Sequence, residues 1–157
     1  MAFLEESRVR VYRVRPKAKI PLRAHGTDAG MDFFYCSSTK SKDRIRINPG
    51  KAVLLGTGVK VEVPQACMLQ IMNKSGIASK KRLIVGACVV DEGYTGEIFV
   101  NLHNIGEHPQ FIESGDKIAQ GVFVRIEKPI LLEVDDDIIY DKETARGSGA
   151  LGSTGDK

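Results

Sequence analysis

Short runs in which apolar and polar residues alternate dominate the chain. This period of two predicts strands with one buried face, in residues 8–15, 44–47 and 59–63. In the first of these runs the phase slips at Tyr12, which indicates a bulge or a bend. Less regular apolar runs predict further strands over residues 68–72, 83–90, 98–102 and 118–126.

Turn residues separate these runs, as at Asn48-Pro49-Gly50 and Pro64. Helical periodicity is nearly absent, and only residues 76–82 are expected to form one short helix. Regularly spaced strands of this kind predict an all-β sandwich, barrel or jelly roll. The length of 157 residues suits a single core, which we expect over residues 1–145.

Composition narrows the class of protein only in part. Aromatic residues make up 6% of the chain and Trp is absent, so aliphatic side chains must fill the core. The net charge of +3 suits an anionic substrate but is too small to indicate one. Three cysteines without CxxC spacing argue against a disulfide framework and a structural zinc site, and Cys67 is expected in the core.

The N-terminus has no basic start followed by an apolar stretch, so no secretion signal is predicted. No run of apolar residues is long enough to span a membrane. We therefore expect a cytoplasmic protein with no membrane partner.

The segment from residue 146 to residue 157 differs from the rest because it is rich in glycine. One interpretation is a C-terminal tail without a role. The other is a mobile flap that binds phosphate, because glycines let backbone N–H groups converge on an anion and Arg146, Ser153 and Thr154 add donors. The GxxxxGK[ST] pattern of a Walker loop is missing.

An acidic run at residues 135–137 is interpreted as a solvated loop rather than a metal site, because adjacent Asp residues in a strand alternate faces.

Five segments in order resemble the signature motifs of the trimeric dUTPase family. They are residues 28–32 (DAGMD), 73–78 (NKSGIA), 86–91 (GACVVD, with Tyr94 and Gly96), 115–120 (GDKIAQ) and the glycine-rich tail. The resemblance implies a jelly-roll-like β fold and a homotrimer with sites at subunit interfaces, closed by the flap of residues 146–157. It also implies hydrolysis of dUTP to dUMP and pyrophosphate with Mg²⁺, and no nucleic acid is required.

The resemblance also implies roles for residues around the phosphates. Asp32 is expected to hold water molecules of the Mg²⁺ shell, which suits an ion that binds few protein ligands. The phosphate cradle is expected from Lys74, Ser75, Gly76 and Gln120. Lys74 and Lys117 stand where the family usually has Arg, and a lysine is a point charge without the bidentate fork of arginine. Lys117 is expected to have a lesser, structural role.

Asp91 is the expected general base, which deprotonates the attacking water. It follows the apolar pair Val89 and Val90, so a strand-end position and partial desolvation are predicted. From the local sequence alone, Asp91 could equally be a turn residue.

Uracil is expected to bind backbone groups of a hairpin, with residues 88–91 (Cys88, Val89, Val90, Asp91) on one arm and Phe99 on the other. The bulk of Cys88 and Phe99 is tolerated there only if both side chains point away. Tyr94 is expected under the deoxyribose, where it leaves no room for a 2′-hydroxyl.

The tail is expected to supply Arg146, Gly152, Ser153 and Thr154 to the substrate, and Leu151 stands where the family usually has a Phe that stacks on uracil.

Two other functions were weighed against this one. A dCTP deaminase shares the fold but needs a catalytic Glu where this chain has Asn101. A non-catalytic nucleotide-binding or regulatory protein would be expected to lose Asp91, Ser75 or Gln120, and the chain keeps all three.

Overall fold

A computed structural model describes residues 8–135, 140, 142 and 147 of the chain. The described part is built from short strands, with one α-helix, α1 (Ser75–Lys81), and one 3-10 helix (Lys40–Lys42). The strands are β1 (Val11–Arg13), β2 (Met31–Phe34), β3 (Arg44–Ile47), β4 (Ala52–Gly56), β5 (Val59–Val61), β6 (Cys67–Met72), β7 (Leu83–Val85), β8 (Val89–Val90), β9 (Phe99–Asn104), β10 (Gln110–Glu113) and β11 (Lys117–Arg125). The prediction of an all-β fold is confirmed.

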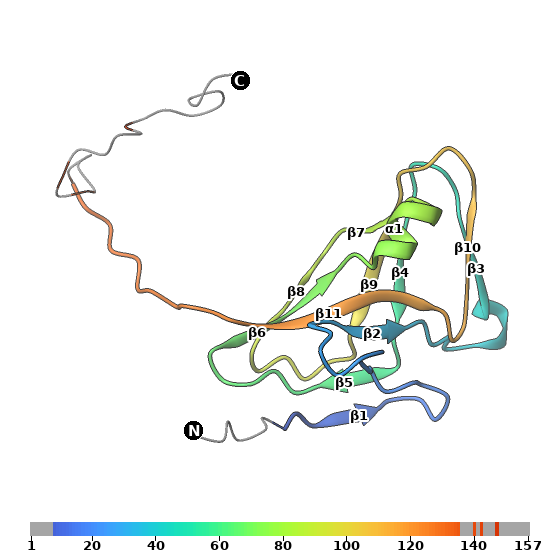
Figure 1. Ribbon diagram of the computed structural model, residues 1–157, viewed down its shortest axis with the longest axis horizontal. Coiled ribbons are helices and arrows are strands. Elements are labelled where there is room, and N and C mark those ends of the chain that lie inside the picture. The colour runs from blue at the N-terminus through green and yellow to red at the C-terminus, as the bar shows by residue number, and fades with distance from the viewer. Residues whose placement is uncertain (1–7, 136–139, 141, 143–146, 148–157) are drawn as a thin grey trace. The chain divides into compact units, whose positions relative to one another are not determined.

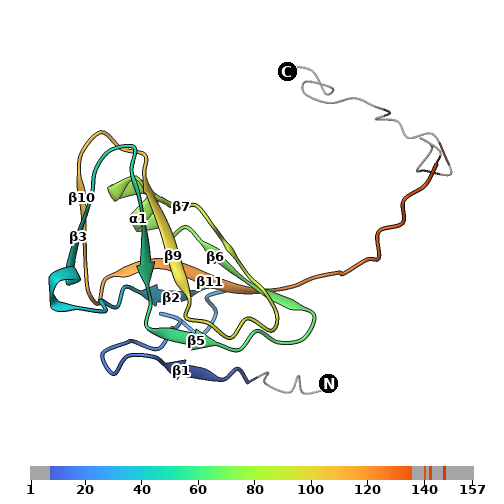
Figure 2. The same cartoon turned by 180° about the vertical axis from the view of Figure 1, so that it is seen from behind.

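Two antiparallel sheets carry most of the core, and Figures 1 and 2 show their strands from opposite sides. One sheet has the order β2-β11-β6-β8 and the other the order β4-β9-β7. Two further strand pairs, β1-β5 and β10-β3, flank them. The long strand β11 links β2 and β6, so residues from three distant parts of the sequence meet along it.

Aliphatic side chains fill the core, as the low aromatic content predicted. Every second residue of β9 is buried, which is the strand period expected from its alternating sequence. In β2 three consecutive residues are buried, so this strand carries no alternation by which its sequence could be recognised. Fully buried side chains include Phe33, Leu69, Ile71, Leu102 and Ile118.

The predicted strand over residues 83–90 is wrong as a single element. It is split into β7 and β8, which belong to different sheets. The break falls at Gly86, where an added Cβ would lie 2.3 Å from Nε2 of His103.

The predicted helix is confirmed within one residue, since Arg82 takes a left-handed conformation (φ 54°) and ends α1.

The chain divides into two compact units, residues 1–127 and 128–157. In the second unit, the described residues 128–135, 140, 142 and 147 belong to no helix or strand. Asp135 is exposed, and the remainder of the acidic run lies outside the described residues. None of the described helices is long and apolar enough to cross a membrane.

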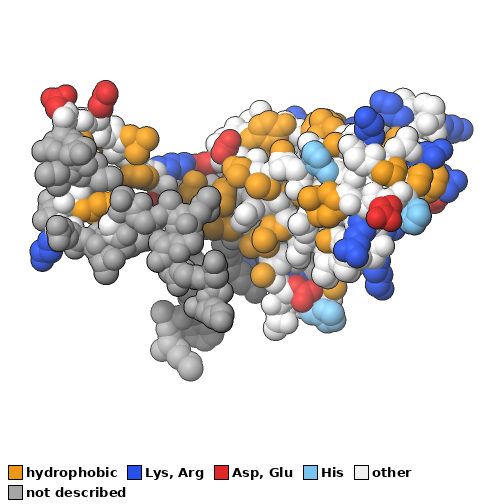
Figure 3. Space-filling model, turned by 90° about the horizontal axis from the view of Figure 1, so that it is seen from above, with side chains coloured by type: hydrophobic (Ala, Val, Ile, Leu, Met, Phe, Trp, Pro, Cys, Tyr) orange, Lys and Arg blue, Asp and Glu red, His pale blue; other side chains and the backbone are white. Residues whose placement is uncertain are grey.

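Basic side chains gather at one end of the first unit. Figure 3 shows them at the right, where β3 and β10 lie in Figure 1. Arg44 stacks over the Phe111 ring at 4.1 Å from the ring centroid and lies 3.4 Å from the Glu113 carboxylate.

Candidate functional site

Asp32 on β2 lies between two lysines. Its side chain is nearly buried, with 7% of its surface exposed. Oδ1 accepts a hydrogen bond from Nζ of Lys74 at 2.7 Å, and Oδ2 lies 2.7 Å from Nζ of Lys117. Lys74 comes from the loop between β6 and α1, whereas Lys117 begins β11. One carboxylate and two ammonium groups therefore form a cluster with a net positive charge.

The two lysines set the ionisation of Asp32. Burial by itself raises the pKa of this carboxyl, since it disfavours the charged form. Hydrogen bonds and charges from Lys117 and Lys74 outweigh burial, so the pKa of Asp32 lies below its ordinary value. The carboxylate is thus ionised at neutral pH.

Gln120 on β11 lies beside this cluster. Its position is opposite Asp32 on one side and Met72 on the other. The side-chain amide donates to the backbone oxygen of Asn73 at 2.9 Å, and an added Cβ at Gly30 would lie 2.3 Å from the Gln120 Oε1 atom. Gly30 thus leaves the space that the Gln120 side chain fills.

The segment from Asn73 to Gly76 connects β6 to the first turn of α1. Asn73 fixes this connection, because its Oδ1 atom accepts the backbone N–H of Val85 at 2.7 Å. Ser75 begins the helix and is exposed, and an added Cβ at Gly76 would contact nothing within 4 Å. Asp32, Lys74 and Gln120 thus lie beside the segment that contains Ser75 and Gly76, and their role at the phosphates stays a prediction.

The residues expected to read uracil lie on two strands that do not pair with each other. Val90 and Val89 of β8 pair with Leu69 and Gln70 of β6, whereas Phe99 of β9 pairs with Gly56 of β4. The Gly86 N–H donates to the Asn101 carbonyl at 2.9 Å, and beyond this contact the described residues show no ladder between β8 and β9. The outer edge of β8 is therefore without a strand partner, and β9 lacks one on its β7 side only before Leu102, so backbone groups there are available to a planar ligand.

The side chains on these two arms differ in exposure. Phe99 is exposed, and its ring reaches the space over Gly56. Cys88 is half-buried, and its carbonyl accepts the Ile71 N–H at 2.7 Å. The Cys88 carbonyl is thus already committed to the sheet, so Val89, Val90 and Asp91 offer the remaining backbone groups of that arm.

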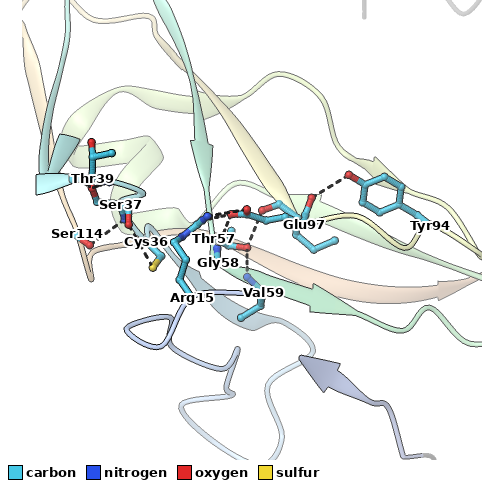
Figure 4. A network of polar contacts seen from close by, with 11 residues as sticks. Arg15, Cys36, Ser37, Thr39, Thr57, Gly58, Val59, Tyr94, Glu97 and Ser114 are labelled. Atoms are coloured by element: carbon cyan, nitrogen blue, oxygen red, sulfur yellow. Dashed lines mark hydrogen bonds and ion pairs between the residues drawn. The ribbon is translucent and has the colours of Figure 1, made fainter. Parts of the chain in front are cut away.

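Tyr94 lies in the loop that joins β8 to β9. Its hydroxyl donates to the Glu97 carbonyl at 3.0 Å, a contact drawn in Figure 4. The ring covers Gly96, where an added Cβ would lie 2.3 Å from the tyrosine oxygen. Tyr94 also lines a groove of about 690 Å³ with residues of β1 and β5, among them Tyr12 and Lys60.

Asp91 directly follows β8, so the predicted strand-end position is correct. Its partial desolvation is not found in the single chain, where Asp91 is exposed. The reason is that the arm ends at a sheet edge with no further strand beside it.

Asp91 and the Asp32 cluster do not meet within one chain. They lie on the outer strands of the order β2-β11-β6-β8, which are separated by about 14 Å, three strand spacings of about 4.8 Å. Asp91 is also displaced along the strands, because Val90 pairs with Leu69 whereas Gln120, beside Asp32, pairs with Met72. The predicted site residues thus form two groups.

The residues around Asp32 suit a magnesium ion that arrives with a phosphate ligand. Among the residues that the structure describes, no three His, Cys, Asp or Glu side chains cluster to hold a metal ion alone. A single ionised carboxylate fits Mg²⁺, which retains several water molecules and takes few protein ligands beside phosphate oxygens.

Sequence reasoning missed three residues that the structure adds to this region. Lys117 contacts the Asp32 carboxylate directly, a contact that the sequence did not predict. Asn73 was quoted as part of a motif, but its hydrogen bonds to β7 and Gln120 carry no sequence signal. Glu97 is partly buried and pairs with Arg15, a pairing over 82 positions that no local pattern can reveal. Five expected contacts from the tail, Arg146, Leu151, Gly152, Ser153 and Thr154, lie outside the described residues.

Known proteins resemble this chain in both sequence and fold. A family model described as dUTPase matches residues 16–155. The deoxyuridine 5'-triphosphate nucleotidohydrolase of Clostridium tetani is 38% identical over 154 residues, which cover 97% of this chain and 99% of that protein. The protein of the same name from Mus musculus is 36% identical over 149 residues, covering 94% of this chain and 85% of that protein.

Solved structures give the same picture. The dUTPase of Staphylococcus bacteriophage 80alpha, solved with dUpNHpp, has a TM-score of 0.83 and 26% identity, and the match covers 94% of this chain and 98% of that one. A dUTPase from phage phi11 of S. aureus, described with a structural Mg(II) ion, has a TM-score of 0.74 and 25% identity over 83% of this chain and 98% of that one.

Proposed function

The chain belongs to the dUTPase family, and on that premise we propose that it hydrolyses dUTP to dUMP and pyrophosphate by attack of water on the α-phosphorus. The observation that carries the proposal is the cluster of Asp32, Lys74, Lys117 and Gln120, which offers two cations beside an ionised carboxylate. Similar proteins named deoxyuridine 5'-triphosphate nucleotidohydrolase, and a similar phage dUTPase structure with dUpNHpp, support dUTP as the substrate.

Lys74 and Lys117 bind the phosphates in this proposal. Their side chains are 31% and 43% exposed, so the Lys74 ammonium group can leave Asp32 for a phosphate oxygen, while Lys117 offers its remaining N–H donors to the phosphates and keeps its contact with Asp32. Ser75 donates its hydroxyl, and Gln120 donates its amide. Phosphoryl transfer depends mainly on positioning and neutralisation of charge, and these four groups supply both.

Asp32 would then hold water molecules bound to a Mg²⁺ ion, because release of Lys74 frees its Oδ1 atom. When bound, the ion would neutralise charge on the triphosphate oxygens. Asp32 remains ionised through its contact with Lys117, which does not depend on the position of Lys74.

Asp91 accepts the proton of the attacking water. A positioned carboxylate is expected to contribute roughly 10²–10⁴-fold to turnover. The distance between Asp91 and the Asp32 cluster supports a site completed by a second chain, in which Asp91 of one chain faces Lys74 of another. We therefore propose a homotrimer with shared sites.

The gap between β8 and β9 binds uracil. In this proposal, backbone groups of Val89, Val90 and Asp91 bind one side of the base and those of Phe99 the other, and a close fit around the pyrimidine excludes the 5-methyl group of thymine. Tyr94 lies below the sugar and excludes a 2′-hydroxyl. The tail closes the site, with Arg146, Gly152, Ser153 and Thr154 at the phosphates and Leu151 over the base.

Incubation with dUTP, UTP, dTTP and dCTP in the presence of Mg²⁺, followed by identification of the products, tests this function. We expect dUMP and pyrophosphate from dUTP and little product from the other three. Release of ammonia from dCTP, or the absence of any product from dUTP, would contradict the proposal.

A further inference from the structure

We infer that Arg15 and Glu97 form a buried clasp that holds Tyr94 in the position from which it rejects ribonucleotides. The clasp is defined here as the ion pair of these two side chains together with their contacts to Gly56 and Gly58. The inference rests on the proposed function, because it concerns how the same site distinguishes dUTP from UTP. Arg15 and Glu97 act as positioning residues and do not touch the substrate.

The ion pair is bidentate and mostly buried. Arg15 donates from Nη1 to Oε2 of Glu97 at 2.9 Å and from Nη2 to Oε1. The exposed fractions of the two side chains are 22% and 11%. Paired N–H donors in a planar fork fix both the distance and the angle of a carboxylate, so the Glu97 side chain has little freedom.

The backbone around Glu97 is held as firmly as its side chain. The Gly58 N–H donates to Oε1 of Glu97 at 2.8 Å, and Oγ1 of Thr57 donates to the Ile98 carbonyl at 2.7 Å. The Ile98 N–H donates to the carbonyl of Val59 at 2.9 Å. The loop that begins at Asp91 is therefore anchored at its far end to the β4–β5 segment.

The Arg15–Glu97 ion pair occupies the space that a side chain at Gly56 would fill. An added Cβ at this position would lie 2.6 Å from Oε1 of Glu97 and 2.8 Å from Nη2 of Arg15. The ion pair is thus pressed against bare backbone. Any side chain at Gly56 must displace Arg15, Glu97 or both.

Tyr94 is hydrogen-bonded to the backbone of Glu97, at the anchored end of this loop. Its hydroxyl donates to the backbone carbonyl of Glu97 at 3.0 Å, while its ring covers Gly96. Figure 4 shows the contacts running without a break from Arg15 through Glu97 to Tyr94. Tyr94 is 47% exposed, so its contacts with Gly96 and Glu97 carry much of the positioning of the ring.

Steric rejection of a hydroxyl depends on such positioning. One extra or missing group of methylene size in a pocket changes discrimination by only about 10–200-fold, so a small shift of the ring is expected to remove much of the selectivity. Loosening the clasp is therefore expected to admit UTP while leaving the reaction of dUTP almost unchanged.

Glu97→Gln tests the effect of the clasp on selectivity, because glutamine keeps the size of the side chain and removes its charge. We expect the ratio of kcat/KM for dUTP to that for UTP to fall roughly threefold to thirtyfold, the usual range for residues that act through others. The change is expected as a lower KM for UTP, with kcat for dUTP retained. Arg15→Lys, which keeps the charge but not the fork, is expected to give an intermediate ratio. Glu113→Gln is the matched control, because it removes an exposed carboxylate paired with Arg44, and it is expected to leave the ratio unchanged.

A second readout needs no nucleotide. The Tyr94 amide donates to the Asp91 carbonyl and the Ile98 amide to the Val59 carbonyl, so hydrogen exchange at Tyr94 and Ile98 reports opening of this loop. Glu97→Gln is expected to speed exchange at both amides, and Glu113→Gln at neither. Unchanged exchange, or equal losses for dUTP and UTP in Glu97→Gln, would overturn the clasp.

Tyr94→Phe tests whether the clasp acts through Tyr94, because it removes the hydrogen bond to Glu97 and keeps the ring. If the clasp acts through Tyr94, the double variant with Glu97→Gln loses no more selectivity than the more affected single variant. Additive losses would show that Glu97 acts by another route and would refute the inference. Failure of the unmodified chain to hydrolyse dUTP would instead refute the proposed function, and amide exchange would still decide whether the clasp holds the loop.

Discussion

The Lys74 ammonium group lies 2.7 Å from the Asp32 carboxylate, although 42 positions of sequence separate the two residues. The contact occupies a lysine that the substrate is expected to need. In the proposed function, a triphosphate therefore competes with Asp32 for Lys74, and the same exchange would free the carboxylate to hold water molecules of a bound Mg²⁺ ion. Lys117 keeps Asp32 paired during the exchange.

Asp32→Asn is expected to lower the free energy of unfolding by about 2 kcal/mol, the usual loss for a hydrogen bond to a charged group. The reason is that Lys74 and Lys117 are left close together without a carboxylate between them. Urea unfolding measures the loss, and added pyrophosphate is expected to restore part of it by binding both lysines. Glu107→Gln, an exposed charge elsewhere, is the control and is expected to change stability by less than about 0.5 kcal/mol. A variant as stable as the parent would show that the cluster does not contribute.

Asp91→Asn is expected to lower kcat roughly 10²–10⁴-fold, because the attacking water loses its base. Binding of a non-hydrolysable dUTP analogue is expected to persist, since the amide keeps the size of the carboxylate. Single-turnover kinetics and calorimetric titration measure the two quantities. Near-normal turnover would remove Asp91 from this role.

Two inactive variants are expected to restore activity when mixed. If Asp91 of one chain serves Lys74 of another, Asp91→Asn and Lys74→Met subunits refolded together rebuild about a quarter of the sites, as random assembly of a symmetric oligomer requires. Residual activity of each variant alone is the baseline, and sedimentation is expected to give a trimer. No recovery in mixed trimers would mean that both residues serve one site from the same chain.

Glu62 is expected to titrate at an unusually low pH. Hydrogen bonds from Arg10 lower the pKa of this carboxyl from 4.5 to about 2. Because the folded pKa is depressed, the stabilisation is present above pH 4.5 and is lost as the pH falls toward 2. Carbon-detected NMR follows the carboxyl, and Arg10→Met is expected to return its midpoint toward the ordinary value. The pair is exposed, so added salt is expected to reduce the shift. A midpoint near 4.5 in the unmodified chain would contradict the contact.

Deletion of residues 146–157 is expected to leave a folded protein with very low activity. The reason is the loss of Arg146, Ser153 and Thr154, which stabilise charge on the phosphates in our proposal. Circular dichroism and steady-state kinetics measure the two outcomes. Leu151→Phe in the full chain is expected to tighten analogue binding by about 1 kcal/mol or less, because stacking on a base replaces simple apolar cover. Normal turnover of the shortened chain would refute the role of the tail.

The sequence predicted strands best where apolar residues alternate, as in β3 and β5. It did not predict β2, because a strand buried along its length has no period to detect. The split of residues 83–90 into β7 and β8 was also missed, since the close approach of Gly86 to His103 is a tertiary contact.

The candidate site shows the same division between local and distant information. Asp32, Lys74 and Gln120 were predicted through motifs, and the fold brings them together. The pairing of Arg15 with Glu97 and the contact of Lys117 with Asp32 were not predicted, because each joins residues more than 80 positions apart. Burial of Asp91 was expected from its apolar neighbours, but a position at the end of an edge strand leaves it exposed in one chain.

The arms β8 and β9 belong to different sheets, so the width of the gap between them is a dimension of the core. Leu69, opposite Val90, and Val100, next to Phe99, are both completely buried between the sheets. A methyl group gained or lost at either position is expected to change how the two sheets pack, and with it the space for the base in our proposal. If uracil binds there, tolerance for modified pyrimidines is expected to depend on these aliphatic positions as well as on the residues that contact the ligand.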